Sequence, residues 1–157
     1  MAKVNHRLIA YILIPIVISL GFLRDYLFVN INWVYLHHTI QRRNQARREF
    51  DFLLEWTPSE INQLKVVLTL LFYALFMGLT VWVIHGLFGK RTFNLITIGI
   101  FAGIFALSGI LYLIGIATPY YSRFYAVVIT MMQTAQSFTP MLLLAVVFKF
   151  FPKSENE

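Results

Sequence analysis

Cysteine is absent from the 157-residue sequence, and charged residues make up only 13% of it. Without cysteine the chain can form no disulfide, no thiolate metal site, no lipoprotein anchor and no cysteine nucleophile. With so few charges and 59% hydrophobic residues, a water-soluble fold would lack the polar surface needed to cover its core. The composition therefore indicates a protein whose solvent is the lipid bilayer.

Long apolar stretches are abundant instead, and four of them alternate with more polar segments. Because about 20 helical residues cross the roughly 30 Å hydrocarbon core of a bilayer, we predict an all-α, polytopic protein with four transmembrane helices. A cleaved signal peptide is the alternative for the first stretch, which follows two basic residues. We expect a single domain over residues 1–157. The expected helices cover about residues 8–29, 58–88, 95–117 and 123–150.

The longest connection lies between the first and second apolar stretches. Two asparagines, Asn30 and Asn32, are expected to end the first helix. Residues 38–56 then carry apolar side chains on one helical face and several arginines on the others, which predicts an interfacial helix lying on the membrane. The motif Thr57-Pro58-Ser59-Glu60 supplies an N-cap, a proline at the first helical position and a capping-box glutamate. The second helix should therefore begin at Pro58.

Basic residues flank the apolar stretches and give the chain a net charge of +6. Anionic lipid headgroups are the expected counterions, and no nucleic-acid partner is predicted. The short turn containing Lys90 and Arg91 favours a cytoplasmic position, because positive charge in short loops sets the orientation of membrane helices. We therefore expect both termini in the cytoplasm.

The last apolar stretch carries a stripe of uncharged polar residues that includes Thr130, Gln133 and Ser137. Their spacing would place them on one face of a continuous helix. Amide and hydroxyl groups in hydrocarbon need hydrogen-bond partners. The stripe therefore pairs with other helices of the same bundle or docks against another membrane protein. A solute pathway is the third interpretation, although such pathways usually include a buried charge.

The third apolar stretch contains small residues in the pattern Gly99-x-x-x-Gly103. Small side chains let helix backbones approach closely. We expect Gly99 and Gly103 to make close helix contacts inside the bundle, with Ala74 and Gly78 of the second helix as the facing groove. A contact between two copies of the chain is the alternative, so a homo-oligomer remains open.

Charged residues gather near the expected membrane edges. Arg24 and Asp25 follow the first stretch, and Arg123 opens the fourth on the same predicted side. We expect these three residues to form an outer-edge polar cluster in which Asp25 and Arg123 pair. The adjacent His37 and His38 would point about 100° apart on a helix, so they do not predict a metal site.

Two motifs, Leu23-Arg24-Asp25-Tyr26-Leu27-Phe28 and Tyr120-Tyr121-Ser122-Arg123-Phe124, precede a last helix that contains Gln133 and Pro140. This order resembles the small four-helix membrane proteins associated with exosortases of the F or X type in Bacteroidetes. The arginine-rich segment and the spacing from Gln to Pro depart from that family. The resemblance implies a bacterial inner-membrane accessory protein beside a polytopic, cysteine-dependent transpeptidase that processes C-terminal sorting tags.

The segment Arg42-Arg43-Asn44-Gln45-Ala46-Arg47-Arg48-Glu49 carries a second resemblance, to small glutathione-using membrane enzymes related to microsomal prostaglandin synthase and glutathione transferase. That family places an Arg four residues before the Asn, where this chain has Ile40. It also keeps this loop in the cytoplasm, opposite to the orientation expected here. The main prediction is a non-enzymatic accessory protein with no cofactor, metal or catalytic residue. A glutathione-dependent enzyme is the alternative.

Overall fold

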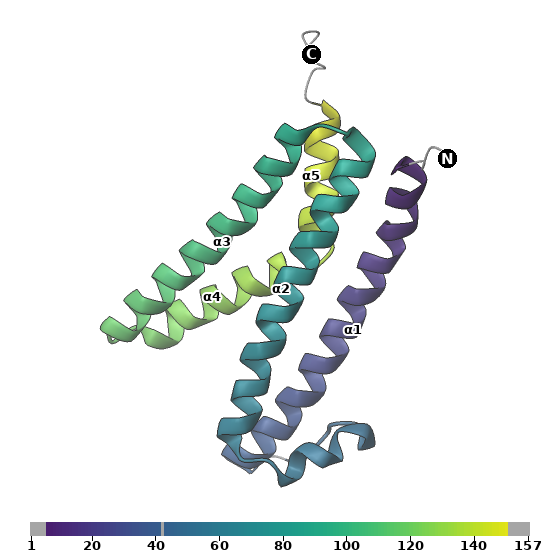
Figure 1. Cartoon of the computed structure of the whole chain (residues 1–157). Helices are drawn as coiled ribbons and strands as arrows, with labels where there is room; N and C mark the ends of the chain where they lie inside the picture. The colour runs from purple at the N-terminus through teal and green to yellow at the C-terminus, as the bar shows by residue number, and fades with distance from the viewer. Residues whose placement is uncertain (1–5, 42, 151–157) are drawn as a thin grey trace. The chain divides into compact units, whose positions relative to one another are not determined.

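The computed structural model describes residues 6–41 and 43–150, which form helices and no strand (Figure 1). Three of the helices are long and apolar enough to cross a membrane, and a bent pair at the end counts as a fourth if it is one span. The all-α class with three or four candidate membrane-spanning helices is therefore confirmed. The elements are α1 (His6–Ile40), the 3-10 helix η1 (Arg48–Glu55), α2 (Pro58–Phe88), α3 (Arg91–Ala117), α4 (Tyr121–Ala135) and α5 (Thr139–Phe150).

Contacts group the chain into two compact units. Unit 1 comprises residues 1–18 and 73–157, and unit 2 comprises residues 19–72. Both α1 and α2 pass from one unit into the other, and each unit has apolar core residues of its own. The single domain over residues 1–157 therefore stays a prediction.

The first helix is longer than the sequence predicted. It continues through Asn30 to Ile40, so the expected end at the two asparagines is wrong. The Asn30 side-chain amide donates to the carbonyl oxygen of Tyr26 at 2.8 Å, and its oxygen accepts the Arg47 backbone N–H at 2.8 Å. Because its own helix and the following connection satisfy this side chain, it does not compete for the helical backbone.

The expected interfacial helix over residues 38–56 is also wrong in extent. α1 ends before Gln41, which adopts a left-handed conformation with φ of 53°. The Asn44 side chain then accepts the Ala46 N–H at 2.9 Å, a local turn that replaces helical hydrogen bonds. Only the eight residues of η1 are helical, and they form a 3-10 helix.

An apolar core joins α1, η1 and α2 within unit 2. The ring of Phe50 in η1 meets the ring of Tyr26 in α1 edge-on, with centroids 5.7 Å apart. Since the charged side chains of η1 are exposed while two of its apolar ones are buried, this short helix is amphipathic. The buried residues of the core are Ile31, Val34, Phe50, Leu53 and Ile61.

The start of α2 follows the sequence motif. The Thr57 backbone N–H donates to the Glu60 carboxylate at 2.8 Å, and the Glu60 N–H donates to the Thr57 hydroxyl at 3.4 Å. These reciprocal hydrogen bonds are the predicted capping box, which is therefore confirmed. α2 begins at Pro58, as the motif indicates.

In unit 1, α4 packs against α3, and α5 then runs from the end of α4 toward the N-terminal end of α3 (Figure 1). α4 starts beside the C-terminal end of α3, where a methyl group on Gly115 would lie 2.9 Å from Cβ of Phe124. α5 ends beside the N-terminal end of α3, where the rings of Phe93 and Phe148 stack with centroids 4.3 Å apart. The ring of Phe88 meets both edge-on and completes a phenylalanine cluster at the turn between α2 and α3.

Replacing Gly115 by alanine should destabilise the contact between α3 and α4. The added methyl would overlap Cβ of Phe124, an atom that moves only with its backbone, and such overpacking costs about 1–3 kcal/mol. Gly109→Ala in the same helix is the matched control, because no packing neighbour described by the structure lies within 4 Å of its new methyl. Thermal unfolding in detergent measures both variants. Equal melting temperatures would contradict the close approach at Gly115.

Candidate functional site

The fourth expected helix is broken in two. α4 ends at Ala135 and α5 begins at Thr139, and the two axes differ in direction by 63°. Pro140 explains the break, since it has no N–H and its ring would collide with the carbonyl of Gln136 in a continuous helix. The single helix expected over residues 123–150 is therefore wrong.

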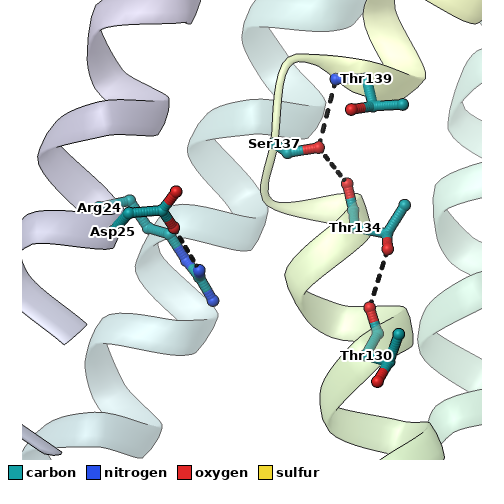
Figure 2. Close-up of polar contacts among 6 residues, drawn as sticks. All are labelled: Arg24, Asp25, Thr130, Thr134, Ser137 and Thr139. Carbon is teal, nitrogen blue, oxygen red and sulfur yellow. Dashed lines mark hydrogen bonds and ion pairs between the residues drawn. The ribbon is translucent and has the colours of Figure 1, made fainter. Parts of the chain in front are cut away.

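Ser137 connects the two halves of the broken helix (Figure 2). Its hydroxyl donates to the Thr134 carbonyl oxygen at 2.7 Å and accepts the Thr139 N–H at 3.2 Å. The same side chain thus satisfies one carbonyl at the end of α4 and one N–H at the start of α5, groups that a helix end leaves without a helical partner. The Gln136 N–H also donates back into α4, to Met132 at 3.0 Å.

The expected polar stripe does not occupy one helical face. Thr130 and Gln133 are exposed residues of α4, whereas Ser137 lies in the break. The Thr130 hydroxyl donates to the Ala126 carbonyl at 2.9 Å, and the Thr134 hydroxyl donates to the Thr130 carbonyl at the same distance (Figure 2). These hydroxyls are satisfied by their own backbone. They therefore need no hydrogen bond from a neighbouring helix. That need was the reason for expecting the stripe to dock against another helix or protein.

Buried polar side chains from two other helices lie at the level of the break. In α2, Thr80 lies between Tyr73 and Ile84. Tyr73 packs in a cluster with Ala135 at the end of α4, and Ile84 packs in a cluster with Leu144 of α5. Thr80 shares the helical face of these two residues and is fully buried. Its hydroxyl has no hydrogen-bond partner among the residues that the structure describes.

Thr97 of α3 lies at the same level as Thr80. It is between Phe93, which packs against the cluster of Ile84, and Phe101, which belongs to the cluster of Tyr73. It is fully buried and donates to the Phe93 carbonyl at 2.8 Å. Gln136 in the break is also buried. Sequence reasoning missed Thr80 and Thr97, because single threonines within apolar helices leave no periodic signal. Buried threonines of α2 and α3 thus lie at the level of the break, where Gln136 is buried too.

Gly99 and Gly103 do not pack against α2. Both are exposed, and a methyl group on either would meet no described packing neighbour within 4 Å, which is equally true of Gly78. The expected groove between these glycines is therefore wrong. α2 and α3 meet instead through Tyr73 and Phe101, whose ring centroids are 5.8 Å apart and where the tyrosine hydroxyl donates to the Phe101 carbonyl. The small-residue face of α3 remains open.

Arg24 and Asp25 lie in the middle of α1 and do not end it. The Arg24 guanidinium contacts Asp25 Oδ1 at 2.7 Å (Figure 2) and lies 4.6 Å from the centroid of the Phe28 ring. Arg123 belongs to the other unit, in the first turn of α4, with its guanidinium 5.7 Å from the Tyr120 ring centroid. The pairing of Asp25 with Arg123 stays a prediction.

Metal-binding groups do not gather anywhere in residues 6–41 and 43–150, where no three His, Cys, Asp or Glu side chains come together. The His37 and His38 rings meet edge-on at the end of α1, with centroids 5.7 Å apart.

Comparison with known proteins gives no assignment: the chain matches no protein-family model, and neither a curated protein nor a solved structure is significantly similar to it. The resemblances to exosortase-associated proteins and to glutathione-using enzymes stay predictions. Functional conclusions for this chain therefore depend on its own geometry.

Replacing Ser137 by alanine should weaken the junction of α4 and α5. The variant loses both hydrogen bonds of the hydroxyl, and the loss of such a capping side chain costs about 0.5–2 kcal/mol. Thr130→Ala is the control, because it removes a hydroxyl that bonds only its own helix and introduces the best helix former. Thermal unfolding followed by circular dichroism compares them. A loss of stability at Thr130 as large as at Ser137 would contradict the bridging role.

Proposed function

We propose that this chain is a non-enzymatic membrane accessory protein that acts by lateral helix contact with another membrane protein. The observation that carries the proposal is the open face of α3. Gly99 and Gly103 are exposed there and have free space beside them. α3 is also the least buried of the three long apolar helices. A small-residue face of this kind allows the backbone of a second helix to approach closely, which is the principal source of helix association in lipid.

Four spans are proposed, namely α1, α2, α3 and the broken pair α4 and α5. The path of the broken pair supports this count, because it starts beside Gly115 at one end of α3 and finishes beside Phe93 at the other. A re-entrant pair would return to the end from which it left. An irregular segment within the bilayer is tolerated where protein satisfies its backbone, as the Ser137 hydroxyl does here.

With four spans, both termini lie on one side of the membrane. The basic turn at Lys90 and Arg91 favours the cytoplasm for that side. The connection that contains η1 then lies outside, with Phe50 and Leu53 buried in unit 2 and its charged residues exposed, as befits an interfacial segment. The proposed location is the inner membrane of a bacterium, with both termini cytoplasmic.

The proposed partner is a polytopic membrane protein, and the family resemblance names an exosortase-type transpeptidase as the first one to test. A second copy of the chain is the other possible occupant of the α3 face. Membrane lipid surrounds the remaining apolar surface, which includes strongly exposed residues such as Leu113 and Phe150.

A glutathione-dependent enzyme is the alternative function. It would use side chains of the first connection, and one of these, Asn44, has a structural task instead, because it accepts the Ala46 N–H. The backbone of the connection is also held to α1, where the Asn30 side chain accepts the Arg47 N–H. This use of the connection supports the accessory role.

The α3 face can be tested by bulk. Gly99→Leu combined with Gly103→Leu should leave the isolated protein folded, because both sites have free space, and should abolish co-purification with the transpeptidase in mild detergent. Gly78→Leu is the matched control in α2, with equal space, and should retain the partner. Undiminished binding by the double variant would refute docking through α3, and equal loss in the control would show that α3 is not the specific surface.

The topology can be tested with single cysteines, since the chain has none of its own. In intact cells a membrane-impermeant maleimide should label a Gln45→Cys variant and leave a Glu157→Cys variant unlabelled. Labelling of both positions would indicate that α4 and α5 form a re-entrant pair. Labelling of position 157 alone would reverse the orientation and favour the glutathione enzyme.

A further inference from the structure

The charged pair in α1 lies deep within the apolar part of its unit. Two contacts fix the register of α1 against α2 inside unit 2. Lys65 Nζ is 4.7 Å from the centroid of the Tyr35 ring, and the Phe28 ring centroid is 6.3 Å from that of Phe72. Beyond Lys65, α2 contains no Asp, Glu, Lys or Arg as far as its end at Phe88. Lys65 therefore marks one boundary of the apolar region.

The depth of the pair follows from the helix rise. Phe72 is seven residues beyond Lys65, which is about 10 Å at 1.5 Å per residue. Arg24 precedes Phe28 by four residues, so it lies about 6 Å deeper again. The sum, about 16 Å, is half of the roughly 30 Å hydrocarbon core. With Lys65 at the membrane boundary, the pair would lie at mid-depth in the bilayer and not at the outer edge that the sequence suggested.

The two charges of the pair differ in their surroundings. The Arg24 side chain is 10% exposed and lies over Phe28, whereas the Asp25 side chain is 66% exposed. The neighbours of Asp25 on the same helical face, Phe22 and Val29, are exposed and apolar. A carboxylate can accept about four hydrogen bonds, and a charged group at this depth is tolerated only when protein or water satisfies it. Asp25 therefore presents unused acceptor capacity on an apolar face.

We propose that Asp25 is a polar docking point, inside the bilayer, for a helix of the membrane partner that offers an uncharged hydrogen-bond donor. Arg24 already neutralises the carboxylate, so a Lys or Arg of the partner would leave a net positive charge in hydrocarbon. A side-chain amide or hydroxyl supplies the donor without that cost. The proposal rests on the proposed partner-binding function and specifies the chemistry of one contact, on a helix other than α3.

The test removes both charges at once, because Asp25→Asn alone would leave the buried charge of Arg24 without its carboxylate. Arg24→Leu combined with Asp25→Leu should leave the melting temperature of the isolated protein equal or higher, since apolar residues can replace a buried ion pair without loss. Binding of the transpeptidase, measured with the full chain in phosphatidylethanolamine and phosphatidylglycerol nanodiscs, should weaken roughly three- to thirtyfold, the range for a hydrogen bond between membrane helices. Val29→Leu is the control on the same face and should bind as the unaltered chain does.

Each other outcome overturns the proposal in a distinguishable way. A lower melting temperature of the isolated double variant would assign the pair a structural role within the chain. Unchanged transpeptidase binding, in a complex that Gly99→Leu with Gly103→Leu still disrupts, would refute the Asp25 contact and leave the accessory function standing. No complex with the unaltered chain would refute both. If the double variant lost only its self-association and still bound the transpeptidase, the contact at Asp25 would be with a second copy of the chain.

Discussion

Hydrocarbon offers no hydrogen bonds, so each polar group that enters it must be satisfied by the protein, and the irregular parts of this structure follow from that constraint. The Ser137 hydroxyl makes the break between α4 and α5 possible, because it satisfies backbone groups on both sides. Asn30 has the opposite effect in α1, where its side chain bonds a carbonyl one turn back and the helix continues. One polar side chain therefore stabilises a break that Pro140 causes, and another allows its helix to continue, according to the partners within reach.

How much the sequence reveals depends on how local the determining interaction is. The start of α2 was predictable, because the capping box lies entirely within Thr57-Pro58-Ser59-Glu60. The all-α membrane class followed from composition and from the lengths of the apolar stretches. The extent of α1 was not predictable, since Asn30 is held by the N–H of Arg47, a contact between residues distant in sequence. Pro140 is a local signal for the break, because it has no N–H, whereas the spacing of Thr130, Gln133 and Ser137 suggested one continuous helix.

The candidate surfaces differ in chemistry. The face of α3 around Gly99 and Gly103 is open and almost without polar groups. It therefore favours close approach of a second helix without selecting a particular residue of the partner. The Asp25 carboxylate accepts hydrogen bonds only from donors in a suitable position, so it can select a partner helix that carries a matching donor. Neither surface was visible as such in the sequence. The glycine pattern suggested internal packing, and the charged pair suggested a membrane edge, because the first helix was expected to end at about residue 29 and in fact continues to Ile40.

The broken helix also bears on how the protein is made. α4 and α5 contain 15 and 12 residues, each shorter than the roughly 20 residues that partition into a bilayer unaided. Phe148 of α5 stacks on Phe93 and meets Phe88, and these two rings flank the turn that joins α2 and α3. That turn is synthesised before α5 emerges from the ribosome. Both aromatic partners of Phe148 are therefore already synthesised when α5 is made, so α5 can pack onto the completed turn of α2 and α3.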